Sequence, residues 1–441
     1  MEFRCITVRY EVKTNWRATS RFIAFGLVSL LVVLGIPNLF SNSLNASSLD
    51  SAQAANTADA VIDWNNTAIA TTQGIAAPLQ ARSLSISHAA IFDAVNAIDR
   101  RYTPYAIDTT APTGTSADAA VASAGYTVLT KLYPAQKENL DKALQASLKK
   151  IPDGRAENDG VKLGREVAEK ILAIRSKDGW DAKVDYKPAT GASAWQPTPP
   201  AYTPPIFTQF SNITPFTFQN KEQFQVPTPP AVTSAEYAKD INEVKNVGGR
   251  NSKVRNADQT SVAIFWTINT PVLWNAAARS AAIAKGNSLI ENARLFALVN
   301  FAITDAYIAG YEVKYKYNFL RPVTAIRNAE KIGNPSITAD PNWEPLIITP
   351  AHPDYISGHS VTSGAAEKIL QKFFNSDDVK LSFTFPAGAV TRYYTSFSQI
   401  SKENENARVW GGIHTRVADI QGTALGHQVA ENAFNNSLKP L

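Results

Sequence analysis

A long helix-forming run, residues 287–316, constrains the fold more than any other feature of this chain. Helical periodicity also extends over residues 56–175, resumes near Ser234 and continues to Asn435. Runs with the alternating pattern of β-strands are scarce. The sequence therefore predicts an all-α protein.

Shorter helices are expected on both sides of this run. Apolar residues at helical spacing and alanine-rich surfaces mark the N-terminal half, and a further run lies near the C-terminus. The predicted helices cover residues 83–98, 117–132, 135–151, 161–176 and 361–374, whereas residues 375–390 are predicted to be irregular.

Residues 187–233 interrupt the helical pattern. The segment holds PTPP, TPPIF and VPTPP with many aromatic and few charged residues. Its proline density excludes a continuous helix, and its aromatic side chains favour an ordered loop packed on the helices, at the rim of a pocket. An interdomain connector is the alternative. The chain would then consist of helical regions 55–186 and 234–441 joined by this loop.

The first 54 residues have the pattern of an export signal. Five basic residues precede an apolar run at residues 22–36, which Pro37 ends, and Ala52-Gln53-Ala54 offers a cleavage site. The run is shorter than the ~20 residues of a membrane span. We expect a cleaved signal peptide and a secreted or periplasmic protein, with an uncleaved membrane anchor as the alternative.

The composition of the chain argues against nucleic-acid binding and bears on its resistance to oxidants. The net charge is +5 for 441 residues, without a basic stripe carrying interleaved aromatics, so nucleic-acid binding is not expected. Sulfur occurs only at Met1 and Cys5, within the predicted leader. The exported chain would contain no disulfide. It would also resist a strong oxidant made at its own site, although sulfur economy explains the same composition.

Three short blocks carry the chemistry. They read KYKYNFLRP at 314–322, SGHS at 357–360 and RVWGGIH at 408–414. Together they supply three cations, a hydroxyl, a backbone N–H beside glycine and two imidazoles. Those groups in one place would bind a tetrahedral oxyanion such as phosphate or vanadate.

The first block pairs two cations. Lys314 and Arg321 are seven residues apart, so two helical turns would place them on one face, and Pro322 is expected to end the helix. Two such cations repel unless they share an anion. A solvated helix face is the alternative, which the aromatic neighbours Tyr315 and Tyr317 disfavour.

The second block precedes a predicted helix. A helix N-terminus presents free N–H groups to an anion, Gly358 allows close approach, and Ser357 adds a hydroxyl. His359 could exchange a proton near neutral pH. Taken alone, a serine in this position is more commonly an N-cap.

The third block spaces Arg408 and His414 six residues apart, which is not one helical face. A turn at Gly411-Gly412 would bring both side chains to one point, with His414 opening a new helix. Three of the five histidines lie between residues 352 and 414. That concentration favours one oxyanion site over three unrelated structural motifs.

The order Lys-x6-Arg-Pro, Ser-Gly-His, Arg-x5-His resembles the superfamily of type 2 phosphatidic acid phosphatases and vanadium-dependent haloperoxidases. Resemblance to the bacterial haloperoxidase-like branch extends to residues 88–105, 256–266 and 316–327. It implies an all-α helical bundle of this kind with an ordered proline-rich loop insertion.

The resemblance also implies roles. Vanadate would be bound by Lys314, Arg321, Ser357, the Gly358 N–H and Arg408, with His414 as the ligand to vanadium. His359 would act as acid–base and Lys314 would polarise the bound peroxide. Hydrogen peroxide would oxidise halide through a peroxovanadate to a hypohalous species, which then attacks a small organic acceptor.

Two other functions remain open. The same pocket serves a secreted acid phosphatase in which His414 is the nucleophile and His359 protonates the leaving group. A non-catalytic oxyanion-binding protein would retain the pocket without turnover. The core residues do not separate the first two chemistries, and the oligomeric state and membrane attachment through the N-terminal segment stay undecided.

Departures from the family pattern concern neighbours of the site. Ile356, Ala407 and Ala418 replace the usual proline, serine and acid. The acid that orients His414 is therefore sought among Asp419, Asp258 and Asp305.

The residue seven positions before His359 bears on which halide the protein would oxidise. His352 stands there, as in bromide-oxidising members, and Tyr311 replaces a common tryptophan. Both favour bromide or iodide, while a histidine–proline turn is the structural alternative for His352.

Overall fold

The computed structural model describes residues 59–385 and 390–441, which belong to one compact unit. The predicted signal peptide, residues 1–54, lies outside the described residues. Within these two ranges no helix is both long and apolar enough to cross a membrane.

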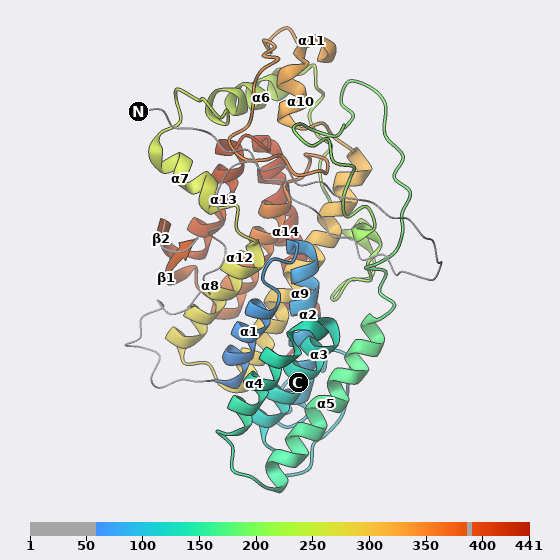
Figure 1. Ribbon diagram of the computed structural model, residues 1–441, viewed down its shortest axis with the longest axis vertical. Helices are drawn as coiled ribbons and strands as arrows, with labels where there is room; N and C mark the ends of the chain where they lie inside the picture. Colours follow the sequence, from blue (N-terminus) through green and yellow to red (C-terminus); the bar gives the residue numbers. More distant parts are fainter. Residues whose placement is uncertain (1–58, 386–389) are drawn as a thin grey trace, which may run out of the picture. The chain divides into compact units, whose positions relative to one another are not determined.

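The N-terminal half is a group of five helices (Figure 1). They are α1 (Ala60–Thr71), α2 (Ala77–Asn96), α3 (Ala117–Leu132), α4 (Lys137–Leu148) and α5 (Arg155–Arg175). Helix α3 has the predicted bounds, whereas α2 and α5 each begin six residues earlier than predicted. Helices α3 and α5 pack closely because α5 carries glycine at the contact: a Cβ on Gly164 would lie 2.2 Å from the Ala120 carbonyl oxygen.

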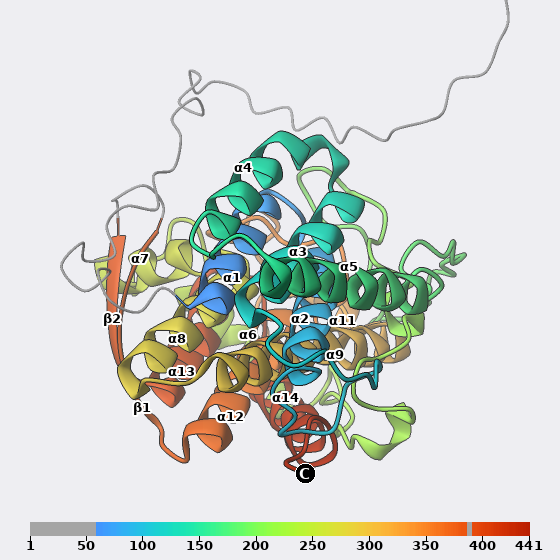
Figure 2. The same ribbon diagram turned by 90° about the horizontal axis from the view of Figure 1, so that it is seen from below.

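The C-terminal half is built around α9 (Leu289–Tyr317), the predicted long helix. A capping box of Ser288 and Glu291 starts α9, and almost its whole length is buried. The other helices are α6 (Ala235–Val247), α7 (Ala257–Phe265), α8 (Thr270–Lys285), α10 (Pro322–Arg327), α11 (Ala329–Ile332), α12 (Gly358–Phe374), α13 (Phe397–Trp410) and α14 (Arg416–Asn436). Helices α2, α12 and α14 surround α9 (Figure 2).

The all-α prediction is confirmed, with one local exception. Strands β1 (Asp378–Phe385) and β2 (Val390–Ser396) form an antiparallel hairpin; β1 lies within the segment 375–390 predicted to be irregular, and β2 begins at its last residue. Leu381 pairs with Tyr394, and both side chains are buried. Two short strands produce too few alternations to stand out in the sequence.

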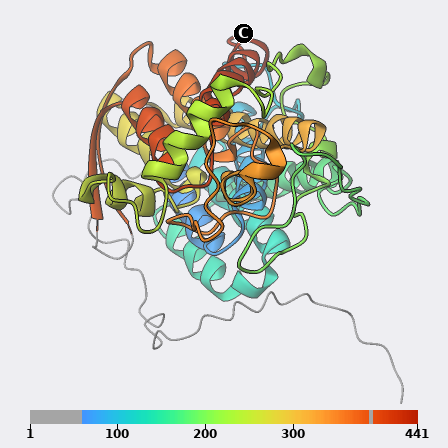
Figure 3. The same ribbon diagram turned by 90° about the horizontal axis from the view of Figure 1, so that it is seen from above.

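The proline-rich segment is ordered and packs on the helices, as predicted; it is green in Figure 3. The Trp195 N–H donates to the Asn318 carbonyl oxygen at 2.8 Å, just beyond the end of α9. Further along, Asp305 of α9 accepts the N–H groups of Phe216 and Thr217 at 2.7 and 2.8 Å. These contacts fix the loop against the helix that carries Lys314.

Candidate functional site

Lys314 and Arg321 do not share a helical face, so that prediction is wrong. Helix α9 ends at Tyr317, Asn318 takes the left-handed conformation at φ 47°, and Arg321 is the N-cap of α10. Pro322 begins α10 rather than ending a helix, because proline's missing N–H is tolerated in the first turn. The break nevertheless brings both cations to one buried place.

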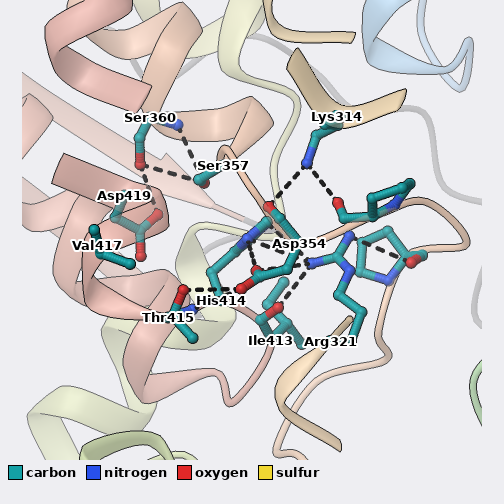
Figure 4. Close-up of polar contacts among 12 residues, drawn as sticks. Lys314, Arg321, Asp354, Ser357, Ser360, Ile413, His414, Thr415, Val417 and Asp419 are labelled. Carbon is teal, nitrogen blue, oxygen red and sulfur yellow. Dashed lines mark hydrogen bonds and ion pairs between the residues drawn. The ribbon is translucent and has the colours of Figure 1, made fainter. Parts of the chain in front are cut away.

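Both cations bind the backbone of residues 350–354 (Figure 4). Lys314 Nζ donates to the carbonyl oxygens of Pro353 and Asp354 at 2.7 and 3.1 Å. The guanidinium of Arg321 donates to the carbonyl oxygens of His352 and Ile413, each at 2.7 Å. Lys314 is 1% exposed and Arg321 0%, so the solvated-face alternative is excluded.

Ser357 is the N-cap of α12, and its Oγ accepts the Ser360 N–H at 3.4 Å. The commoner role of serine in this position therefore holds here. Gly358, the first residue of the helix, lies beside the lysine: a Cβ there would stand 4.0 Å from Lys314 Cε. The first turn of α12 accordingly presents its free N–H groups to the region of Lys314.

The Gly411-Gly412 turn exists, and its shape requires glycine. Gly412 has φ +80°, and a Cβ there would lie 2.3 Å from the Gly248 carbonyl oxygen. After the turn, His414 lies two residues before α14, with Thr415 as the N-cap. Arg408, at the end of α13, donates from Nη1 to the Trp266 carbonyl oxygen at 2.6 Å.

The acid that orients His414 is Asp354, which sequence reasoning missed. Its Oδ1 lies 2.6 Å from His414 Nδ1, and its Oδ2 accepts the Thr415 hydroxyl at 2.8 Å. Asp354 is 0% exposed. The only sequence signal was an acid inside the block HPDYISGHS, sixty residues before the histidine that it contacts.

None of the three acids proposed from the sequence contacts His414, so these candidates are corrected. Asp258 is exposed and pairs with Arg392. Asp305 binds the loop amides described above. Asp419, in the first turn of α14, is buried and accepts the hydroxyl of Ser360, at the start of α12, at 2.8 Å. The positions of these three acids in the sequence did not indicate which groups they contact.

The Asp354 contact fixes the tautomer of His414. Because a carboxylate accepts from Nδ1, the proton of the neutral ring resides there, and the lone pair on Nε2 accepts from Arg321. Arg321 Nη1 lies 3.1 Å from this Nε2. A nucleophilic or ligating nitrogen is thus held among the cations.

Comparison with known proteins agrees with this geometry. A family model described as the VCPO second helical-bundle domain matches residues 294–440, which include all three blocks. The vanadium chloroperoxidase of Curvularia inaequalis is 27% identical over 379 residues, 68% of this chain and 61% of the relative. The chain thus spans about three fifths of that relative's length.

Solved structures extend the likeness. A bacterial vanadium-dependent iodoperoxidase aligns with TM-score 0.74 and 26% identity, over 86% of this chain and 96% of its own. By sequence and by fold, this chain is similar to vanadium haloperoxidases. An apo-type bacterial vanadium-dependent chloroperoxidase has the same fold, with TM-score 0.69 at 16% identity over 82% of this chain and 94% of its own.

Burial destabilises the charged form of the cations at this site. Burial, followed by the charge of Arg321, lowers the pKa of Lys314 well below its usual value. Burial likewise lowers the pKa of Arg321 and Arg408 to about 10 and raises that of Asp354 to about 6. A bound anion would relieve the lysine and both arginines together.

The other two histidines between residues 352 and 414, His352 and His359, lie near these cations. His359 Nε2 is 3.3 Å from the Ile268 carbonyl oxygen, and burial followed by Arg408 lowers its pKa. His352 Nδ1 is 3.0 Å from Arg321 Nη2, and its ring meets Tyr311 edge-on at 5.6 Å between centroids. Burial keeps both rings neutral near pH 7.

These residues fit vanadate, the group that the haloperoxidase family implies. Arg408 Nε is buried and makes no hydrogen bond among the described residues. Lysine, arginine, hydroxyl and amide donors suit the oxygens of a tetrahedral anion, while an imidazole nitrogen suits its central atom. The donors that could hold the anion are Lys314, Arg321, Ser357, Gly358 and Arg408, with His414 as the ligand.

Proposed function

We propose that this protein is a vanadium-dependent haloperoxidase that oxidises bromide or iodide with hydrogen peroxide to a hypohalous species. The observation that carries the proposal is the buried Asp354–His414 pair, at 2.6 Å, which leaves the His414 Nε2 lone pair facing Arg321. The similarity to vanadium haloperoxidases, including 26% identity to an iodoperoxidase, supports it.

Vanadate, when bound, supplies an electrophilic centre that activates hydrogen peroxide for oxygen transfer to halide. The protein's part is electrostatic. Lys314, Arg321 and Arg408 offset the anion's charge in a buried place, where such interactions are strong. Ser357 and the Gly358 amide add neutral donors, and His414 supplies the ligating nitrogen.

His359 moves the proton. Its lowered pKa keeps the imidazole neutral at pH 7, so the ring can accept a proton from entering peroxide and return it later in the cycle. Its Nε2 lies near a backbone carbonyl rather than a carboxylate, so no fixed negative charge competes for the proton.

The halide preference rests on His352 and Tyr311. The neutral imidazole, 3.0 Å from Arg321, and the tyrosine ring form a polarisable wall beside the cations. Such a wall favours the larger, more easily oxidised halides. We therefore propose bromide or iodide over chloride as substrate, with a small organic molecule as the final acceptor.

One side-by-side assay tests this function. Full-length protein is incubated with orthovanadate, and peroxide-dependent bromination of a dye is measured beside hydrolysis of a chromogenic phosphate ester. Bromination that requires vanadate and disappears in His414→Ala supports the proposal. Phosphate release without bromination would identify an acid phosphatase instead, and tight vanadate binding with neither activity would leave an oxyanion-binding protein.

Export is proposed separately, from the leader pattern in residues 1–54. The mature protein should be recovered outside the cytoplasm with its N-terminus just after Ala54. Recovery of full-length chain in the membrane fraction would support the uncleaved anchor.

A further inference from the structure

Three helices that meet at the oxyanion site, α12, α13 and α14, carry polar side chains that lead away from it. These residues are seven positions apart on α12, are linked by steps of three or four on α13 and recur every four positions on α14, so on each helix they lie on one face. We call this set the polar spine; it comprises Ser360 and Glu367 on α12, Ser401, Asn404, Glu405 and Arg408 on α13, and Asp419, Thr423 and His427 on α14.

At its inner end the polar spine touches the oxyanion site. Ser360 Oγ donates to Asp419 Oδ1 at 2.8 Å and lies 3.3 Å from Ser357 Oγ, as Figure 4 shows. Asn404 Nδ2 lies 3.5 Å from Ser360 Oγ. Ser360, Asn404 and Asp419 are fully buried, so this polar contact lies inside the protein.

At its outer end the polar spine opens into a surface hollow. Thr423 Oγ1 donates to Glu405 Oε1 at 2.7 Å, and His427 Nε2 lies 3.4 Å from Glu367 Oε2. All four residues, together with Ser401, line the hollow. Two carboxylates and an imidazole thus stand where the line of polar groups meets solvent.

Polar atoms without a protein partner are concentrated along this line. Over the described ranges, ten buried side-chain nitrogen and oxygen atoms make no hydrogen bond. Five belong to the polar spine: Ser401 Oγ, Asn404 Oδ1, Arg408 Nε, Asp419 Oδ2 and His427 Nε2. An unsatisfied buried group costs about 1–3 kcal/mol, and native proteins usually satisfy such groups with ordered water.

We propose that the polar spine holds a chain of internal waters that conducts protons between the hollow at His427 and the oxyanion site at Ser357. The inference rests on the proposed function, because oxidation of one halide by peroxide to hypohalous acid and water consumes one proton. The site is buried, so that proton needs a path. In each hop one O–H bond breaks as another forms on the next oxygen, and no charge accumulates.

Hydration of the polar spine is tested first, without reference to activity. A high-resolution crystal structure of the protein should show ordered water within hydrogen-bond distance of Asn404 Oδ1 and Ser401 Oγ. Absence of ordered water along the polar spine would overturn the proposal even if the protein proved to be a haloperoxidase.

Conduction is tested with Asn404→Leu, which fills the middle of the polar spine, and Asn404→Ser, which keeps a polar group and leaves room for water. In Asn404→Leu the turnover number should fall about tenfold and its solvent deuterium isotope effect should rise. Vanadate affinity should stay within about twofold of wild type. Asn404→Ser should retain most of the turnover.

Thr72→Val is the matched control, because Thr72 is a buried, hydrogen-bonded threonine at the end of α1, outside the polar spine. Thr423→Val replaces Asn404→Leu if the latter does not fold. An unchanged turnover number and isotope effect in folded Asn404→Leu or Thr423→Val would contradict proton conduction along the polar spine. If the wild-type protein oxidises no halide, the proposed function fails while proton conduction remains to be tested. The rate of proton uptake on tungstate binding, read with a pH indicator, is then compared between wild type, Asn404→Leu and Asn404→Ser.

Discussion

At the scale of single residues, the site depends on Asp354. The carboxylate holds His414 by its Nδ1 at 2.6 Å and is itself fixed by Thr415, so the ring has one orientation and one tautomer. Loss of such an orienting partner typically costs 10–100-fold in ligand affinity or activity.

Asp354→Asn should therefore lower vanadate affinity or halide oxidation about 10–100-fold. Asp258→Asn is the matched control, because Asp258 is an exposed acid whose partner is Arg392. Vanadate titration and initial rates measure both variants. Equal behaviour of the two would show that the Asp354 contact does not serve the site.

The depressed pKa of Lys314 predicts the pH dependence of anion binding. A bound anion favours the protonated lysine and raises its pKa, so binding takes up protons. Affinity should be highest at low pH and should fall as pH rises through the lysine pKa of the complex.

Tungstate is a suitable probe, since it stays a dianion at neutral and alkaline pH, so a change of affinity with pH reports titration of the protein rather than of the anion. Calorimetry in buffers of different ionisation enthalpy reports the protons taken up. Net proton release on binding, or affinity that increases with pH, would contradict the electrostatics described for Lys314.

At the scale of elements, the turn between α13 and α14 decides whether His414 reaches the site. Gly412 combines a positive φ with a backbone contact to Gly248, whereas Gly333, at the end of α11, has φ +71° and open space around its missing Cβ. Substitution of Gly333 therefore measures the cost of backbone strain alone, whereas substitution of Gly412 adds a steric clash with Gly248.

Gly333→Ala should cost about 1 kcal/mol of unfolding free energy, the usual penalty for a left-handed residue. Gly412→Ala should cost more and should also weaken vanadate binding, because His414 must shift with the turn. Denaturant unfolding and vanadate titration measure both effects. Equal costs with unchanged vanadate affinity would mean that the turn does not position His414.

Much of the fold could be read from the sequence, because helical periodicity is a local signal. It gave the bounds of α3 and placed α9 within two residues. Pro322 was misread, since a proline that ends one helix and a proline that starts the next look alike in sequence. The Asp354–His414 contact joins residues sixty apart, and no local pattern reports which acid a distant histidine meets.

At the scale of the whole molecule, the proline-rich loop and the site are coupled through α9. Asp305 accepts two backbone N–H groups of the loop two and a half turns before Lys314 on the same helix. The loop is therefore part of the packing that holds the lysine's helix in place.

Asp305→Ala should lower the unfolding free energy by about 1–3 kcal/mol, because it leaves buried N–H groups of Phe216 and Thr217 without a partner. It should also expose residues 187–233 to proteolysis. Limited digestion with mass spectrometry locates the first cuts. A digestion pattern identical to wild type would show that the loop is held by its aromatic contacts alone.

The most direct test of the account is reconstitution of vanadate-free protein with measured amounts of orthovanadate, followed by peroxide-dependent iodide and bromide oxidation. The account predicts no activity without vanadate, a linear rise to saturation at one vanadate per chain, and loss of activity in His414→Ala. Halide oxidation that is independent of vanadate, or that persists in His414→Ala, would contradict it.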